Sequence, residues 1–241
     1  MMKRSPQSWY QRQMFDPGLM GWLVNPFFLA RRELMRHLKP LLGQLNGEVL
    51  DVGCGRKPYE ALVAADTYVG LDFDSPVTRE LAAADVYYAG GKFPLNDTRF
   101  DGVLCTQVLE HVFTPHEFLE EIARVLKPEG VLVLTVPFVW DEHEQPHDFG
   151  RYSSFGLKSL LEQHGFDLIS QNKSGAGGRT LAQMTVGYWY KVTRSQSRIW
   201  NASVQVLGLS CLTLIGWMLS SCLPADPDLF LDNIVFARKR K

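Results

Sequence analysis

The sequence has few cysteines and no cysteine pattern. Its 241 residues include four, at positions 54, 105, 211 and 222, and none forms a C-x-x-C pair. Such spacing predicts neither a zinc knuckle nor a disulfide-stapled scaffold. We expect reduced thiols in a cytoplasmic protein.

A surplus of positive charge is missing as well. With 25 Lys and Arg against 26 Asp and Glu, the formal net charge is −1 at pH 7. A surface that binds nucleic acid needs a basic excess, and the one basic run is 238–241. We therefore expect no nucleic-acid partner. The first residues lack the unbroken apolar stretch of a signal peptide, so none is expected.

Between residues 199 and 225 charge is absent altogether. An apolar run of this length is long enough to cross a bilayer. However, a single crossing would separate the last strand pattern, 233–237, from the rest of the fold. Gly208 and Gly216 predict a break into two shorter helices, and our first expectation is an insertion packed on the protein.

Two other interpretations of 199–225 stay open, a homodimer surface and a peripheral contact with membrane lipid. Trp200 and Trp217 suit the membrane, because tryptophan concentrates where lipid meets water. Basic residues precede the segment, at positions 191, 194 and 198. The protein would then be cytoplasmic but membrane-associated, and a lipid or lipid-linked acceptor would dock there.

Strand and helix patterns alternate after residue 46. Strands are expected at 49–52, 67–71, 85–88, 100–105, 131–136, 166–170 and 233–237, and helices at 58–65, 116–126 and 154–164. This alternation predicts a Rossmann-like α/β fold, a doubly wound, mostly parallel seven-stranded sheet with helices on both faces. Residues 1–46 are expected to form an N-terminal helical cover on domain 47–241. A hydrophobic helical insertion, about 180–228, is expected before the last strand.

The first expected strand ends in the turn Gly-Cys-Gly at 53–55. Two glycines let the backbone turn sharply and approach a ligand, and the helix expected after them would present free N–H groups. Asp72 follows 21 residues after Asp51, at the end of the second strand. A carboxylate there accepts both hydroxyl hydrogens of a ribose, and Phe73 would stack on an adenine. The plain alternatives are a tight strand-to-helix turn and a solvated aspartate.

Four segments stand in order along the chain, VLDVGCG at 49–55, YVGLD at 68–72, FDGVLCTQVLEHV at 100–112 and ARVLKPEGVLVLTVP at 123–137. Together they resemble the class I S-adenosylmethionine-dependent methyltransferases of the type 11 group. The resemblance covers residues 47–170 and implies S-adenosylmethionine as the cofactor. The cofactor-binding residues it implies are Asp51, Gly53, Cys54 and Gly55 for the methionine part, Asp72 for the ribose, Phe73 and Gly90 near the adenine, and Gln107 closing over the cofactor.

The sequence departs from that family in two places. A third glycine is missing, because Arg56-Lys57-Pro58 follows the turn. Ala89 stands where the family often has an acid, so adenine recognition would rest on backbone groups near Gly90. The glycine turn and Asp72 would also suit NAD, and an NAD-dependent oxidoreductase is the second enzyme considered.

The resemblance implies transfer of a methyl group from S-adenosylmethionine to a small or lipid-linked acceptor, with oxygen preferred to nitrogen or carbon. The GCG-x-x-PY turn and the loop after the fifth strand are similar to bacterial proteins of surface-glycan pathways, which makes a glycan acceptor an option. The alternative from another class is a catalytically inactive partner subunit that only binds the cofactor. The intact glycines and the polar stretch at 143–152 argue against it.

The loop after the fifth expected strand, 137–152, is dense in titratable groups. Loops at the carboxyl ends of strands bind ligands in this class of sheet. A His–Asp pair there would orient an imidazole as a general base, although the same residues would also cap a helix and cover a surface loop. The residues predicted are His143, His147, Asp148 and Tyr152 as catalytic, with Trp140 and Arg151 binding substrate.

No metal is predicted. HEQPH at 143–147 matches the H-E-x-x-H zinc pattern, but that pattern needs a helix, which Pro146 disfavours. Some related quinone methyltransferases hold a metal with a Glu-His pair like Glu110-His111 and an acid at the position of Gln107. Because Gln107 lacks that carboxylate, we expect the pair to pack beside the cofactor. Because Pro146 disfavours the helix of the zinc pattern, we expect the protein to hold no stoichiometric zinc.

Overall fold

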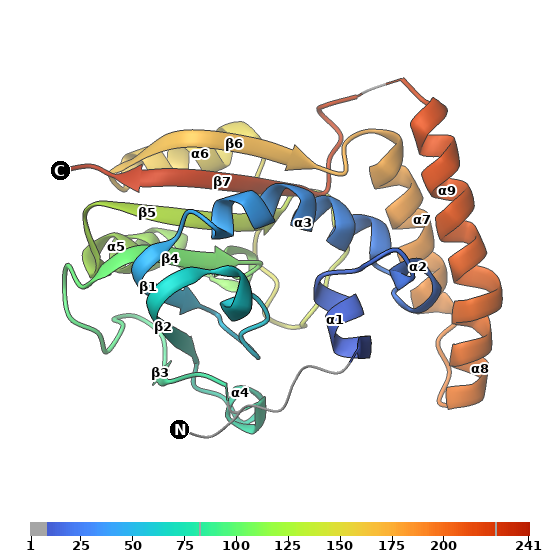
Figure 1. Cartoon of the computed structure of the whole chain (residues 1–241), viewed down its shortest axis with the longest axis horizontal. Coiled ribbons are helices and arrows are strands. Elements are labelled where there is room, and N and C mark those ends of the chain that lie inside the picture. The colour runs from blue at the N-terminus through green and yellow to red at the C-terminus, as the bar shows by residue number, and fades with distance from the viewer. Residues whose placement is uncertain (1–8, 82, 225) are drawn as a thin grey trace. The chain divides into compact units, whose positions relative to one another are not determined.

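The computed structural model describes residues 9–81, 83–224 and 226–241 (Figure 1). Contacts within the chain group it into two compact units. The sheet unit comprises residues 37–173 and 232–241, and the helical unit comprises the chain up to residue 36 together with 174–231. The predicted boundary at residue 46 does not match this grouping, because the N-terminal helices group with the hydrophobic insertion. Residues 1–8 of the predicted helical cover lie outside the described residues.

The sheet unit is built on one seven-stranded sheet with the order β3-β2-β1-β4-β5-β7-β6, which confirms the Rossmann-like fold (Figure 1). Strands β1 to β5 pair in parallel, whereas β7 runs antiparallel to β5. The sheet is therefore mixed but mostly parallel, as predicted. The strands are β1 (Asn46–Val52), β2 (Ala64–Phe73), β3 (Val86–Tyr88), β4 (Phe100–Thr106), β5 (Leu126–Pro137), β6 (Phe166–Ser174) and β7 (Asp232–Lys239).

The central strands are apolar because they are buried on both sides. Val49, Leu50 and Val52 of β1 are fully buried, and so are the apolar residues in the middle of β4 and β5. Parallel sheets covered on both faces require such uninterrupted apolar runs. In register, Val52 pairs with Cys105 and Cys105 with Leu134, so the carboxyl ends of β1, β4 and β5 lie at one edge. The loops that leave this edge carry the predicted site.

Helices of the sheet unit flank these strands. They are α4 (Pro76–Leu81), α5 (Pro115–Val125) and α6 (Ser154–Gln163). Helix α5 buries Phe118, Leu119, Ile122 and Val125, a spacing that turns one face of the helix to the core. Helix α6 is capped at its N-terminus by Ser153, whose hydroxyl accepts a hydrogen bond from the N–H of Gly156. That cap satisfies one of the free donors at the start of the helix.

The helix predicted at 58–65 is wrong. A single 3-10 turn, Glu60–Leu62, stands in its place, and β2 already begins at Ala64. Residue Lys57 has a φ of +51°, a conformation that no helix continues. The run from Ala64 to Leu71 then pairs with β1, with one irregularity in the register, and this pairing ends any helix before residue 64. The glycine turn is consequently not followed by the helix N-terminus that we expected to face the ligand.

The helical unit contains α1 (Trp9–Phe15), α2 (Gly21–Val24), the start of α3 (Phe28–Leu42), α7 (Gly178–Val192), α8 (Arg198–Ser203), the π-helical turn η3 (Val204–Leu209) and α9 (Ser210–Cys222). Buried Gln183 of α7 ties α3 to α7, since its amide accepts from the N–H of Ala30 and donates to the carbonyl of Pro26. Glu33 and Arg179 form an ion pair of 2.7 Å. Small residues let α7 and α9 pack closely, and a Cβ on Gly216 would lie 2.8 Å from that of Ala182.

The uncharged segment forms one continuous helix from Arg198 to Cys222, through α8, η3 and α9. The predicted break at Gly208 and Gly216 is therefore wrong, because both glycines continue the helix. The helix is 25 residues long. Its most apolar 18-residue stretch has a mean hydropathy of 1.7, and only 17% of that stretch is buried. One face of this helix packs on α7, where Gly216 lies against Ala182, so our first expectation of a segment packed on the protein holds for that face, while most of the other side chains are exposed. By length and composition this helix is apolar enough to cross a membrane.

Candidate active site

The glycine turn at the end of β1 is built from two residues with positive φ, Gly53 at +70° and Gly55 at +48°. The N–H groups of Gly53 and Cys54 both donate to the carbonyl of Leu71, which fixes the turn against β2. A Cβ on Gly53 would lie 2.3 Å from Val108, so only glycine fits. At Gly55 a Cβ would meet nothing within 4 Å. The turn therefore leaves open space beside Gly55, as a ligand-binding cradle requires.

Asp72 closes this cradle at the end of β2. Its Oδ2 accepts from the N–H of Gly55 at 2.9 Å and its Oδ1 from that of Phe73 at 2.8 Å. Each carboxylate oxygen keeps a further lone pair, so two ribose hydroxyls are able to donate to it. Burial raises the pKa of Asp72, and the two backbone hydrogen bonds oppose that rise. The predicted ribose contact fits this geometry.

Asp51 is a buried carboxyl at the end of β1. Tyr68 donates its hydroxyl to Oδ2 of Asp51 at 2.6 Å. Burial raises the pKa of Asp51 to about 7, while the Tyr68 hydrogen bond and the charge of Lys57 lower it. A cationic ligand group beside Asp51 would favour the ionised form. Sequence reasoning missed Tyr68, whose only signal is its place in the YVGLD strand.

A cavity of about 170 Å³ opens beside Phe73, the residue that follows Asp72. Phe73 and Tyr88 form one wall, with their rings in edge contact at 5.8 Å between centroids. Val112 and Phe113 line it as well, and Gly90 and Gly91 leave its floor open. An adenine needs such apolar walls and exposed backbone groups. Together with the Asp72 cradle, the residues present therefore fit S-adenosylmethionine.

Gln107 ends β4 with a φ of +55°. Its Nε2 donates to the hydroxyl of Thr135 at 3.1 Å, and its backbone N–H donates to the carbonyl of the same residue at 2.9 Å. These bonds hold Gln107 against the end of β5. Its predicted closure over the cofactor stays a prediction.

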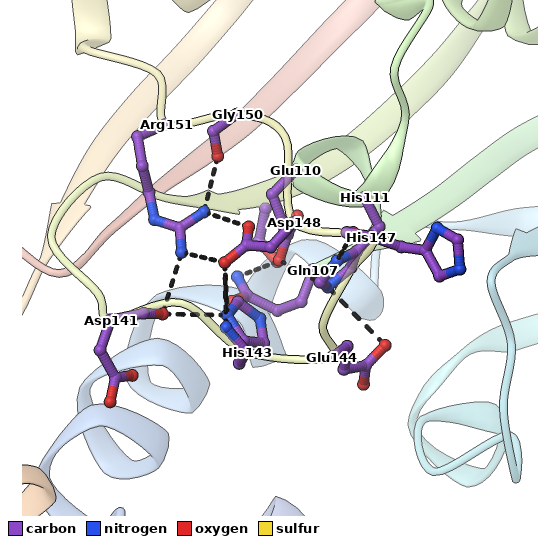
Figure 2. Close-up of polar contacts among 11 residues, drawn as sticks. Gln107, Glu110, His111, Asp141, His143, Glu144, His147, Asp148, Gly150 and Arg151 are labelled. Atoms are coloured by element: carbon purple, nitrogen blue, oxygen red, sulfur yellow. Dashed lines mark hydrogen bonds and ion pairs between the residues drawn. The ribbon is translucent and has the colours of Figure 1, made fainter.

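The loop after β5 is organised by Asp148 and Arg151 (Figure 2). The two terminal nitrogens of Arg151 bond the two oxygens of Asp148 at 2.6 and 2.7 Å, a bidentate pair. Arg151 also donates to the carbonyls of Gly150 and Asp141. The Asp148 side chain is only 4% exposed, and the Arg151 bond lowers the pKa of its carboxyl to about 2. Asp148 is thus a fixed carboxylate that orients its neighbours and does not take up a proton near neutral pH.

His143 is the residue that this pair orients. Its Nδ1 lies 3.2 Å from Oδ2 of Asp148 and 3.2 Å from the carbonyl of Asp141 (Figure 2). Its backbone N–H donates to Asp148 as well. Both neighbours of Nδ1 are acceptors, so Nδ1 carries the hydrogen and Nε2 keeps a lone pair. The predicted His–Asp pair is therefore formed, and His143 is its histidine.

The other residues predicted for this loop have different positions. The ring of His147 points away from Asp148 and contacts the ring of Phe149 (Figure 2). The two terminal nitrogens of Arg151 are bonded to Asp148 and two carbonyls, whereas its buried Nε has no hydrogen-bond partner among the described residues, and its predicted substrate contact stays a prediction. Tyr152 packs against the core, and burial raises the pKa of its hydroxyl, which disfavours the predicted role as a base. Trp140 is half-buried, and its predicted substrate contact stays a prediction.

Glu110 is the residue whose position sequence reasoning missed. It lies in the 3-10 turn Leu109–His111 after β4, and its carbonyl accepts from the N–H groups of Phe149 and Gly150. Its carboxyl is fully buried, and neither oxygen has a hydrogen-bond partner among the described residues. Burial raises the pKa of Glu110 to about 8. The one sequence signal was the pair Glu110-His111, which we expected to pack beside the cofactor.

His111 stands between Glu110 and the β5 loop. Its Nδ1 lies 2.7 Å from the carbonyl of His147, and its Nε2 lies 3.8 Å from Glu110 and 3.9 Å from Glu144. One ligand atom each from Glu110, His111 and His143 lies within 4.8 Å of the others. Two imidazoles and a carboxyl thus converge at the edge of the site (Figure 2).

Comparison with known sequences shows the family to which the chain belongs. The model described as a methyltransferase domain matches residues 28–171, more than half of the chain. A Mycolicibacterium smegmatis protein named as an S-adenosylmethionine-dependent methyltransferase is 34% identical over 135 residues, which are 50% of this chain and 52% of that relative. The match thus spans about half the length of that relative. A ubiquinone biosynthesis O-methyltransferase of Rhodopseudomonas palustris is 28% identical over 202 residues, 68% of this chain and 78% of the relative.

Solved structures share the fold. The [4+2]-cyclase SpnF aligns with a TM-score of 0.57 at 19% identity, over 95% of this chain and 94% of its own. A Haemonchus contortus phosphoethanolamine N-methyltransferase, solved with S-adenosylhomocysteine, aligns with a TM-score of 0.55 at 16% identity, over 92% of this chain and 56% of its own. At such identities these structures support the fold, and the reaction has to be argued from the site.

Proposed function

Because this chain belongs to the class I S-adenosylmethionine-dependent methyltransferases, we propose that it transfers the methyl group to a hydroxyl oxygen of a small or lipid-linked acceptor, such as a lipid-linked glycan. The main observation in favour of an oxygen acceptor is the His143–Asp148 pair, because a hydroxyl acceptor needs a base. One of the relatives is named as an O-methyltransferase, which supports the same acceptor atom. The alternatives of an NAD-dependent oxidoreductase and an inactive partner subunit gain no support from the comparisons.

The reaction is a displacement at carbon. When bound, the cofactor supplies a methyl group on a sulfonium, which is an excellent leaving group. The acceptor oxygen forms the new bond to the methyl carbon as the sulfur–carbon bond breaks, and the electron pair stays on sulfur. The protein's main contribution is to hold the acceptor in line with the methyl group.

A hydroxyl acceptor must also lose its proton. His143 is placed to accept it at Nε2, because Nδ1–H is held by Asp148 and Asp141. The fixed carboxylate of Asp148 then stabilises the imidazolium that forms. This role makes His143 the catalytic base and Asp148 a positioning residue.

Two measurements test this proposal on the purified chain. Calorimetric titration with S-adenosylhomocysteine should show binding that Asp72→Ala abolishes, because Asp72 lines the cofactor cradle. Incubation with methyl-labelled S-adenosylmethionine and a bacterial lipid extract should then label a lipid fraction in an ether linkage. Absence of cofactor binding would overturn the methyl transfer, and label found only on amine or carbon would overturn the oxygen acceptor.

We further propose that the helix Arg198–Cys222 contacts a membrane surface. Its large apolar side chains point outward, with Leu207 76% and Met218 64% exposed, and the basic residues Lys191, Arg194 and Arg198 stand at its start. Anionic lipid attracts such basic residues, while exposed apolar side chains enter the lipid interface. A single crossing does not suit the chain, because β6 before it and β7 after it belong to one sheet. The helix would therefore lie in one face of the bilayer.

Flotation with vesicles tests the contact. The protein should float with phosphatidylglycerol-containing vesicles and less with neutral ones, and Leu207→Glu with Met218→Glu should prevent flotation. Phe155→Glu is the matched control, because Phe155 is equally exposed but lies on α6 of the sheet unit. If the wild type does not float and sediments instead as a dimer that the same two substitutions dissociate, the surface is a homodimer interface and the membrane proposal fails.

The cytoplasmic side of the membrane is the location that we propose. All four cysteines are unpaired, and Cys211 and Cys222 are exposed. Exposed thiols persist in a reducing compartment. Fractionation of cells should find the protein in the cytoplasm and on the inner face of the membrane, where protease added outside intact cells does not reach it.

A further inference from the structure

We propose that Glu110, His111 and His143 bind a divalent transition-metal ion. Glu110 and His111 come from the 3-10 turn after β4, and His143 comes from the loop after β5 (Figure 2). Their ligand atoms lie within 4.8 Å of one another. Neither element holds the three groups alone, so the site exists only in the folded sheet unit.

The first support is the carboxyl of Glu110. A buried carboxyl without partners is costly, and buried polar groups in native proteins are nearly always satisfied. Both oxygens of Glu110 lack a hydrogen-bond partner among the described residues, and the nearest imidazole nitrogen is 3.8 Å away. That distance is too long for a hydrogen bond but leaves room for an ion between the two groups.

The second support is the orientation of both histidines. His111 directs Nδ1 at the carbonyl of His147, and His143 directs Nδ1 at Asp148 and the carbonyl of Asp141. Every one of these partners is an acceptor, so each Nδ1 carries the hydrogen and each Nε2 keeps its lone pair. Metal-binding histidines are held in this way by a carboxylate or carbonyl oxygen behind the ring. The rings themselves are in edge contact, 4.8 Å between centroids.

The donor set selects the class of ion. Imidazole nitrogens with a carboxylate suit zinc, iron, nickel or copper, whereas magnesium prefers oxygen alone. Ligands of a tetrahedral zinc are separated by about 3.4 Å, so the three groups would draw together by about 1 Å. Exposed Glu144 lies 3.9 Å from Nε2 of His111 and is available to complete the set. If Glu144 stays in solvent, the three protein ligands leave one position of a tetrahedral site open for a further oxygen.

This site differs from both metal sets considered in the sequence. His147 of the HEQPH stretch contributes only its backbone carbonyl, and Gln107 bonds Thr135. Our sequence-based expectation of no stoichiometric zinc was argued from the HEQPH stretch alone. It did not include His143 paired with Glu110, since these are brought together by tertiary structure alone.

Metal binding goes beyond the proposed function and is measured without turnover. An ion on Nε2 of His143 occupies the lone pair that the proposed mechanism uses for the proton. A hydroxyl bound to such an ion becomes more acidic by itself. His143 therefore either binds the ion or accepts the proton, and not both at once. We expect the protein to bind S-adenosylhomocysteine with and without the ion.

The test is titration of the full chain, stripped with EDTA, with ZnCl₂ and separately with MgCl₂. The Cys211→Ser, Cys222→Ser form is used beside the wild type, because both thiols are exposed and bind zinc themselves. We expect one zinc per chain and weaker binding of magnesium. Titration with cobalt should give the visible absorption of a site with nitrogen and oxygen ligands.

Variants locate the ion. Glu110→Gln keeps the shape of the buried side chain and should weaken zinc binding by at least about 10-fold, as should His143→Ala. His147→Ala keeps its backbone carbonyl and should bind zinc like the wild type. The second control is His116→Ala, since the His116 and His164 rings lie 5.0 Å apart and form a competing pair on the surface.

Each result of the zinc titrations either supports the metal site or overturns it. No zinc binding, or zinc binding that only His116→Ala or the cysteine changes weaken, would overturn the metal site. S-adenosylhomocysteine titrated into the same samples reports on the cofactor site, so loss of one activity is not mistaken for loss of the other.

Discussion

Nδ1 of His143 lies 3.2 Å from Oδ2 of Asp148, and the same carboxylate is held by both terminal nitrogens of Arg151. The cation keeps Asp148 ionised, and the ionised carboxylate holds the imidazole with its hydrogen on Nδ1. Arg151 therefore determines indirectly, through Asp148, that the free lone pair of His143 is on Nε2.

His143→Gln should lower methyl transfer to a hydroxyl acceptor by about 10²-fold or more, because a positioned base contributes about 10²–10⁴ to such rates. The affinity for S-adenosylhomocysteine should stay within about twofold, since His143 lies outside the cofactor cradle. His147→Gln is the matched control and should keep its rate. The assay is transfer of labelled methyl under saturating cofactor, and an unchanged rate in His143→Gln would remove it from the mechanism.

Arg151→Met should destabilise the protein by about 2 kcal/mol or more, because it leaves the buried carboxylate of Asp148 without its cation. The double change Asp148→Asn, Arg151→Met removes both charges and should recover part of this loss. Urea unfolding followed by circular dichroism gives the free energies of unfolding. Equal destabilisation of the single and double variants would mean that the pair itself contributes little.

The affinity for S-adenosylhomocysteine should rise with pH around neutrality. The pKa of Asp51 is raised to about 7, so below that pH the free protein holds a proton on Asp51. A cationic amino group of the ligand favours the ionised form, so binding below pH 7 must release that proton and the affinity falls by up to about tenfold per pH unit. Calorimetry between pH 5.5 and about 8.5 measures the slope.

Two variants check that Asp51 is the group that titrates. Asp51→Asn should bind weakly and without the slope. Tyr68→Phe removes a hydrogen bond that lowers the pKa of Asp51 and should therefore move the transition to higher pH. A slope that survives in Asp51→Asn would assign the titration elsewhere. For the free protein the sign is opposite: the raised pKa of this acid stabilises the fold at low pH, and that contribution is lost as the pH rises from about 4 to about 7.

Gly53→Ala and Gly55→Ala should separate the fold from the ligand site. At Gly53 a Cβ would lie 2.3 Å from Val108 in a residue with positive φ, so we expect a loss of about 2 kcal/mol or more in unfolding free energy. At Gly55 nothing lies within 4 Å, so about 1 kcal/mol is expected together with weaker cofactor binding. Adding Val108→Ala should restore part of the unfolding free energy that Gly53→Ala loses, because it removes the side chain with which the new Cβ clashes. Equal losses of unfolding free energy in both variants would show that the positive φ, and not the clash with Val108, destabilises Gly53→Ala.

Much of the sheet was predictable from local sequence. Strands that are buried on both faces need continuous apolar runs, and the runs at 49–52, 100–105 and 131–136 occur within β1, β4 and β5. The helix predicted at 58–65 failed because Lys57 has a positive φ and β2 begins as early as Ala64, where it pairs with β1, and pairing across the sheet is invisible in a local pattern. Likewise, Gly208 and Gly216 do not interrupt the helix Arg198–Cys222, because helix interiors tolerate single glycines at a modest cost.

The sequence by itself determined the cofactor end of the protein. Gly53, Gly55 and Asp72 lie at the ends of β1 and β2, and neighbouring parallel strands necessarily end at one edge, so their spacing along the chain was enough. The acceptor end was decided by tertiary structure. Glu110 and His143 are 33 positions apart in loops after different strands, and their approach depends on the Asp148–Arg151 pair and on the bonds from Phe149 and Gly150 to the Glu110 carbonyl. Such long-range contacts have no period and no fixed spacing, so only the folded sheet shows which histidine meets which acid.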